Sequence, residues 1–392
     1  MAAHLQTIDR STPISAPVSG WRRLLADWAV VGSVEVICQA LGTVTSLLLR
    51  MLLSPAQMGI WQAVKLVLSY ASYANLGVSK GAARELTVAL GRGDLAKAQR
   101  GLDLAFTTNI LSSLAYAAVL AGAGIWVGLR GTGEWSSAWA AGLAIGGLLA
   151  ALGRYASFQV TVLRAKQAFA TTSRLSALEA VTTLVVGGAC TWLWGLPGLY
   201  AGTLGVMGAS LVYLSRFGKL RFSWAWDRGE MRRLIAIGSP ILLAGVVYSL
   251  FRSLDKLMIL AYMPDREFQL GCYSLALMVS AQLYGIGNML SIVMGPRYGE
   301  KFGQCGDRRQ VALLAARATE LQATAMALPA ALALVLAGPV LGRMLPDYET
   351  GLAPLVWLVP GMVLLSLSLP ASQYLVAIDR QKRALAAVLA AA

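Results

Sequence analysis

The sequence predicts an all-α polytopic membrane protein, and three observations support this fold class. Hydrophobic residues make up 57% of the chain and charged residues only 13%, with a mean hydropathy of +0.62. Apolar segments long enough to cross about 30 Å of hydrocarbon as helices recur along the whole chain. Basic residues gather in every second gap between these segments. Function is therefore expected within the bilayer, because no polar stretch is long enough for a sizeable soluble domain.

Ten segments are expected to span the membrane. They run over 28–49, 59–79, 102–128, 136–160, 175–194, 197–214, 234–262, 271–293, 311–337 and 351–376. An eleventh apolar helix is expected to begin at Ala384. Its residues up to Ala392 would rise only about 13 Å, too little to cross, so this span is expected to be truncated.

The distribution of basic residues predicts the orientation. Lys and Arg are frequent in the N-terminal tail and in the even-numbered gaps, whereas the odd-numbered gaps contain only four of them, namely Arg50, Arg130, Arg266 and Arg343. The positive-inside rule then places the N-terminus in the cytoplasm. The net charge of +14 fits contact with anionic membrane lipids, so no nucleic-acid partner is expected.

The inventory of reactive side chains argues against a metalloenzyme or a hydrolase. The only histidine is His4, in a polar tail, and the four cysteines, Cys38, Cys190, Cys272 and Cys305, form no Cys-x-x-Cys pair. A His-based triad, a His-ligated metal and a disulfide framework are therefore excluded. We expect no catalytic residues, no metal and no cofactor.

A shift of about 212 residues lays the second half of the chain over the first. Gly59-Ile60-Trp61 then coincides with Gly271-Cys272-Tyr273, and the basic gaps that follow also align. The predicted organisation is a cytoplasmic tail (1–27), an N-lobe of six spans (28–214), a cytoplasmic linker (215–233) and a C-lobe of four spans plus a partial fifth (234–392). The gap at 81–101 is expected to form two amphipathic helices, the second capped by Asp94.

Polar residues recur at helical spacing inside four spans that the repeat relates. These stripes are Glu35, Gln39, Gly42 and Ser46; Lys65, Ser69, Ser72 and Ser79; Tyr248, Arg252 and Asp255, with Lys256 adjacent; and Tyr273, Ser280, Tyr284 and Asn288. Charges in hydrocarbon are costly and tend to face a partner or a hydrated cavity. The stripes therefore predict a wet, positively biased cavity between the two lobes.

Simpler interpretations compete for each charge. The side chain of Lys65 could equally reach the lipid headgroups or face a cavity. Arg154 lies near a span end, so its side chain is expected to reach the headgroups. Arg252 and Asp255 are expected to form an ion pair that borders the cavity. Glu35 has no cation at helical spacing, which makes it the first candidate for a proton-linked group, and Glu179 is the second.

Several segments together resemble oligosaccharide flippases. They are Leu49–Trp61, Asn75-Leu76-Gly77, Gly91-Arg92-Gly93-Asp94, Gly238-Ser239-Pro240 and Ser253–Ile259. The resemblance, which extends over about 28–310, is to the Wzx-like polysaccharide transporter branch of the multidrug/oligosaccharidyl-lipid/polysaccharide (MOP) exporter superfamily. It implies a MATE/MOP-like two-lobe helical bundle. The family has twelve or more spans, so the C-lobe of this chain is incomplete by comparison.

The resemblance also implies a function, namely moving an undecaprenyl-pyrophosphate-linked oligosaccharide to the outer leaflet of the bacterial inner membrane by alternating access, for O-antigen, capsule or exopolysaccharide assembly. Lys65, Arg252 and Lys256 would then neutralise the pyrophosphate. Side chains that would contact the sugars are Gln39, Ser69, Ser72, Tyr248, Tyr284 and Asn288. H⁺ or Na⁺ coupling would involve Glu35, Asp255 and Glu179, and polysaccharide polymerase or other assembly proteins are possible partners.

Two other functions compete with flipping. A multidrug exporter of the same superfamily would share the architecture, but its cavity should be acidic, whereas the polar stripes here lean cationic. A polytopic enzyme of glycan assembly would need a large outer loop or acidic donor-binding motifs, which the sequence lacks.

Overall fold

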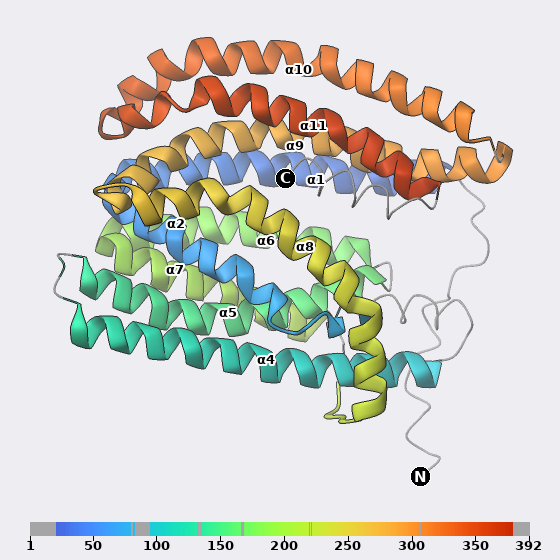
Figure 1. Cartoon of the computed structure of the whole chain (residues 1–392), viewed down its shortest axis with the longest axis horizontal. Coiled ribbons are helices and arrows are strands. Elements are labelled where there is room, and N and C mark those ends of the chain that lie inside the picture. The colour runs from blue at the N-terminus through green and yellow to red at the C-terminus, as the bar shows by residue number, and fades with distance from the viewer. Residues whose placement is uncertain are drawn as a thin grey trace.

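The protein is a bundle of long helices that run roughly side by side (Figure 1). The computed structural model describes residues 21–79, 81–82, 95–131, 133, 135–165, 168–218, 220, 222–305 and 307–378. Among these, the long helices are α1 (Trp21–Leu52), α2 (Pro55–Tyr70), α4 (Leu95–Arg130), α5 (Ser136–Ala165), α6 (Phe169–Thr182), α7 (Gly188–Phe217), α8 (Arg228–Tyr262), α9 (Arg266–Cys305), α10 (Arg308–Met344) and α11 (Leu355–Ala377). Short 3-10 helices are η1 (Ala71–Tyr73) and η3 (Pro346–Leu352), and η2 (Thr183–Gly187) is a π-helical turn.

The helices agree with the expected all-α polytopic fold. Six helical segments of the described chain are long and apolar enough to cross a membrane. One of them, Ala170–Phe217, covers two of the expected spans, because Gly195 interrupts it with a φ of 61°. The break lies where the sequence predicts a turn at 195–196.

The second span is interrupted where the sequence predicts a continuous helix. α2 ends at Tyr70, and Leu76 and Gly77 adopt left-handed φ values of 53° and 86°. Asn75 stabilises this turn, since its Oδ1 accepts a hydrogen bond of 3.2 Å from the Gly77 N–H. The amphipathic pair expected at 81–101, including the cap at Asp94, falls mostly outside the described residues, as do the tail up to residue 20 and the eleventh helix expected from Ala384.

The helices form two groups. α4, α5, α6 and α7 pack together, and α9, α10 and α11 pack together on the other side (Figure 1). α1 and α2 contact both groups, while α8 runs diagonally across the bundle and packs on α9. The lobe boundaries derived from the repeat remain a prediction.

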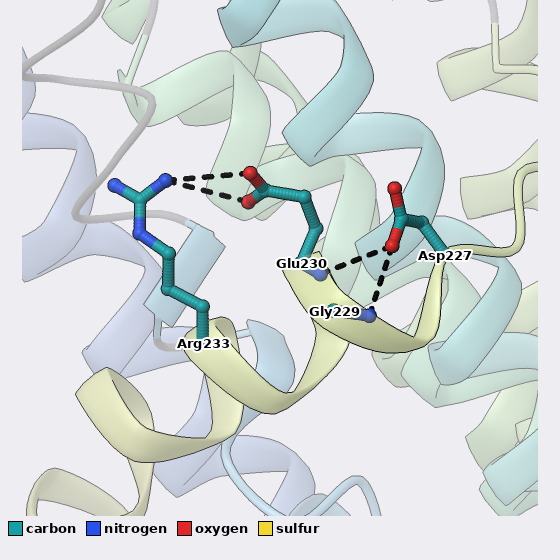
Figure 2. A network of polar contacts seen from close by, with 4 residues as sticks. All are labelled: Asp227, Gly229, Glu230 and Arg233. Carbon is teal, nitrogen blue, oxygen red and sulfur yellow. Dashed lines mark hydrogen bonds and ion pairs between the residues drawn. The ribbon is translucent and has the colours of Figure 1, made fainter.

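One end of the bundle holds the turns α1–α2, α4–α5 and α8–α9, and we call it the turn end. The other, the linker end, holds residues 222–227. There Phe106 stacks on Phe222 at 5.1 Å, and Asp103 of α4 accepts hydrogen bonds from the N–H and hydroxyl of Ser223. Asp227 then caps α8 by accepting from the N–H groups of Gly229 and Glu230 (Figure 2).

α2 and α9 approach so closely at the turn end that only glycine fits. A Cβ on Gly59 would lie 1.7 Å from the carbonyl oxygen of Glu267, and a Cβ on Gly271 would lie 1.8 Å from that of Pro55. A shift of 212 residues converts one contact into the other. The repeat seen in the sequence is therefore also a pseudo-symmetric contact between its two copies.

This packing predicts that Gly59→Ala destabilises the protein. The added methyl meets the backbone of Glu267, which cannot rotate away, so we expect a melting temperature several degrees lower in detergent. Gly42→Ala is the matched control, because a Cβ there meets no atom within 4 Å and alanine favours the helix by up to about 1 kcal/mol. Equal melting temperatures for the two variants would contradict the close approach.

Candidate functional site

Lys65 of α2 lies on an exposed face of its helix. Its Nζ is 5.9 Å from the centroid of the Trp61 ring, one turn earlier. Ser69 and Ser72, one and two turns later, are also exposed. Their hydroxyls donate to the carbonyls of Leu66 and Ser69, at 2.6 and 3.0 Å, which leaves the hydroxyl oxygens able to accept from a ligand.

The charged residues of α8 turn toward α9. The Arg252 guanidinium lies 4.9 Å from the centroid of the Tyr284 ring, a cation–π contact. Asp255 accepts hydrogen bonds from the Tyr273 hydroxyl, at 2.5 Å, and from the Lys256 N–H, at 2.8 Å. The expected ion pair between Arg252 and Asp255 is not seen among the described residues, because the carboxylate is engaged by Tyr273.

The fold brings the predicted cations of α2 and α8 into one electrostatic group. The charge of Lys65 is repelled by Arg50 of α1 and by Lys256, and Lys256 is in turn attracted by Asp255 and repelled by Arg252. Cations that lie near one another in a helical bundle raise each other's energy, and among the described residues Asp255 is the carboxylate beside them. An anion placed among them would lower it.

Polar contacts join the helices that carry this group. The Gln39 Nε2 of α1 donates to the Gln282 Oε1 of α9 at 2.9 Å, and the hydroxyls of Tyr70 and Ser253 join α2 to α8. Asn288 is half-buried on α9, one turn beyond Tyr284. The side chains of Glu35 and Tyr248 lie outside the described residues, so their predicted roles stay predictions.

Glu179 stands apart from the cationic group. Its Oε1 accepts a hydrogen bond of 2.8 Å from Ser210 of α7, inside the group formed by α4 to α7. The π-helical turn η2 follows four residues later, and such turns are frequent at functional sites. The structure therefore does not bring Glu179 together with Asp255, the other described acid proposed for ion coupling.

Arg154 does not snorkel, contrary to expectation. It is buried, and its guanidinium donates to Ser113 Oγ at 2.6 Å, to Asn109 Oδ1 at 2.7 Å and to the Ala71 carbonyl. Ala71 is the residue at which α2 gives way to η1. Arg154 thus adds a side-chain donor to the carbonyl at the broken end of α2, which also accepts from the Ala74 N–H at 3.1 Å.

The sequence analysis missed Arg50, which it assigned to a gap between spans. Arg50 lies in the last turn of α1, is 3% exposed and bonds to both Ser46 and Ser274. A signal for it was present, because Arg50 continues the stripe that contains Ser46 by one more step of four residues.

Comparison with known families identifies the chain. The sequence profile of a family described as polysaccharide biosynthesis protein matches residues 47–345. The chain belongs to this family. No curated protein matches it by sequence.

Solved structures show which fold this family member has. An inward-facing multidrug resistance MATE family transporter of the MOP superfamily aligns with a TM-score of 0.70 and 14% identity, over 89% of this chain and 83% of that one. An outward-facing conformation of such a transporter gives a TM-score of 0.61 and 15% identity, over 92% and 84%. A mutant of the Vibrio cholerae MATE transporter VcmN gives 0.62 and 17%, also over 92% and 84%. The protein is therefore a multi-pass membrane protein with a MATE-like fold.

The contacts of Arg154 predict a structural role. In Arg154→Met the Asn109 Oδ1 loses its donor in a buried setting and the carbonyl of Ala71 keeps the Ala74 N–H alone, which costs about 2 kcal/mol. We expect a clearly lower melting temperature in detergent. Arg317→Met on α10, where the arginine is exposed, is the control, and an unchanged melting temperature for Arg154→Met would show that the buried network is dispensable.

Proposed function

We propose that this protein moves an undecaprenyl-pyrophosphate-linked oligosaccharide from the inner to the outer leaflet of the bacterial cytoplasmic membrane, with its N-terminus inside. The observation that carries the proposal is the cationic group of Lys65, Lys256 and Arg252 on α2 and α8. A family of polysaccharide biosynthesis proteins and the fold of a transporter both agree with this function. Transport would involve no chemical change of the lipid-linked sugar.

The physical requirement is the same for any lipid with a charged headgroup. A bare pyrophosphate in hydrocarbon has lost its hydration, which is prohibitive unless cations and hydrogen-bond donors replace it. Lys65, Lys256 and Arg252 supply three positive charges, and charge-assisted hydrogen bonds to phosphate are about twice as strong as neutral ones. The lipid tail would stay in the bilayer while the headgroup lies among these cations.

Polar side chains near the cations suit the sugars. Ser69 and Ser72 can accept from sugar hydroxyls, and Tyr284, beside Arg252, offers an aromatic face. Gln39, Asn288 and Tyr248 complete the proposed sugar-binding set. Cell-surface glycan assembly would make polysaccharide polymerases natural partners of such a flippase.

Multidrug export is the second candidate, favoured by the solved structures that share the fold. An organic cation would be repelled by Lys65, Lys256 and Arg252, and Asp255 is the carboxylate that the described residues place beside them. The charge of the described group therefore favours an anionic substrate.

The proposal predicts that Lys65→Ala and Arg252→Ala each lower surface glycan at least about tenfold in a flippase-null strain carrying the gene, at equal protein abundance. Tenfold corresponds to about 1.4 kcal/mol, which is comparable with the net contribution of one hydrogen bond to a charged group. Arg317→Ala, which removes an exposed arginine from α10, should keep the glycan at the level of the unmodified protein. Full complementation by the Lys65→Ala/Arg252→Ala double variant would remove these cations from the mechanism, and ethidium resistance in the same strains would point to drug export instead.

Ion coupling is proposed to involve Glu35, with Asp255 and Glu179 as further candidates and H⁺ or Na⁺ as the ion. Glu35→Gln removes the titrating group while keeping its shape, so we expect transport in reconstituted vesicles to lose its dependence on pH. Glu35→Asp should retain that dependence. A pH profile that is identical in Glu35→Gln and the unmodified protein would exclude Glu35 as the coupling group.

A further inference from the structure

Arg50 is a buried cation at the turn end with an incomplete set of partners. One of its terminal nitrogens donates to the Ser46 carbonyl at 2.8 Å and to the Ser46 hydroxyl at 2.5 Å, and contacts the Met278 sulfur at 3.4 Å. The other donates to the carbonyl and the hydroxyl of Ser274, at 2.8 and 3.1 Å. Its Nε is buried without a hydrogen-bond partner. Among the described residues, no carboxylate forms an ion pair with Arg50.

The partners of Arg50 belong to different halves of the repeat. Ser46 lies on α1, and Ser274 lies on α9. Close by, the Tyr348 hydroxyl of η3 donates to the Leu53 carbonyl at 2.8 Å. Burial raises the pKa of the Tyr348 phenol, so Tyr348 remains neutral and supplies no counter-charge. The guanidinium therefore holds the two halves together through neutral acceptors alone.

A buried cation held only by neutral groups is poorly compensated. Removing a guanidinium from water costs several kcal/mol, which carbonyls and hydroxyls recover only in part. A phosphate oxygen would be a stronger acceptor than Ser274, because both members of that hydrogen bond carry charge. Arg50 also acts electrostatically on Lys65, so an anion beside Lys65 is within reach of its field.

We propose that Arg50 is an anion-released latch: it ties α1 to α9 at the turn end until a phosphate-type anion beside Lys65 draws its guanidinium away from Ser274. Loss of the Ser274 contacts removes one direct tie between the halves, and opening of the turn end then separates the α2–α9 contact at Gly59 and Gly271 and the Tyr348–Leu53 hydrogen bond. The anion would then leave toward the side that the predicted topology places outside. This inference rests on the proposed anionic substrate and adds a residue and a trigger to it.

The test follows the distance between the halves at the turn end. Spin labels replace the exposed Met51 of α1 and Glu349 of η3 in an otherwise cysteine-free protein, and the distance distribution is measured by double electron–electron resonance. Inorganic pyrophosphate in detergent is the first probe. Liposomes containing undecaprenyl pyrophosphate, compared with liposomes of neutral lipid, separate a lipid headgroup from a free anion.

We expect pyrophosphate to increase the population with separated labels in the unmodified protein. Arg50→Met should not respond, Arg50→Lys should respond weakly because it keeps the charge but not the forked donors, and Ser274→Ala should open at a pyrophosphate concentration several-fold lower. The melting temperature of each variant establishes that it is folded. Ser274→Ala keeps the carbonyl contact and Arg50→Lys keeps the charge, so the test does not depend on Arg50→Met alone.

Separate outcomes distinguish the latch from the proposed function. A response of Arg50→Met equal to that of the unmodified protein would overturn the latch. The latch would also be overturned if pyrophosphate raised the melting temperature of the unmodified protein, but not that of Lys65→Ala, while the distance between the labels stayed the same. Absence of any Lys65-dependent stabilisation by either probe would instead overturn the anionic substrate, and the latch with it.

Discussion

The close approach of α2 and α9 at the turn end is the constraint on which the rest of the arrangement depends. At Gly59 and Gly271 the backbone of one helix lies against the carbonyls of Glu267 and Pro55 on the other, and a Cβ at either glycine would collide with them. Apolar residues of both halves, including Met58 and Leu275, are fully buried around this contact. Helices in lipid gain little from hydrophobic burial, so such close backbone packing is a main source of association. It fixes where α2 and α9 present their other faces.

The position of α2 is fixed at its other end by different means. Arg154 and Tyr116 donate to the carbonyls of Ala71 and Val67, where the regular hydrogen bonds of the helix cease. Gly77 and Gly238 then meet backbone to backbone at the linker end. Lys65 thus lies on a short helix that is anchored at both ends. A rigidly placed charge is better suited to select an anion than one on a mobile segment, since less freedom is lost on binding.

The distribution of buried and exposed cations also separates structure from function. Arg154 is buried and engaged by oxygen atoms on several sides, whereas Lys65 is exposed and rests against the Trp61 ring. Arg50 falls between these cases, because it is buried but its Nε has no partner. A buried cation whose donors all have acceptors indicates a structural role. A cation with an unused donor can exchange its partners for a ligand.

The sequence by itself determined the all-α membrane class and the break at Gly195, because hydropathy and glycine placement act locally along the chain. It also predicted that Lys65, Arg252 and Lys256 belong together. Only the tertiary structure decided that Asp255 bonds to Tyr273, that Arg154 is a scaffold residue and that Arg50 joins α1 to α9. The energy of a charge depends on which groups surround it in space, and those groups come from distant parts of the chain, as with Arg50 and its partner 224 residues away.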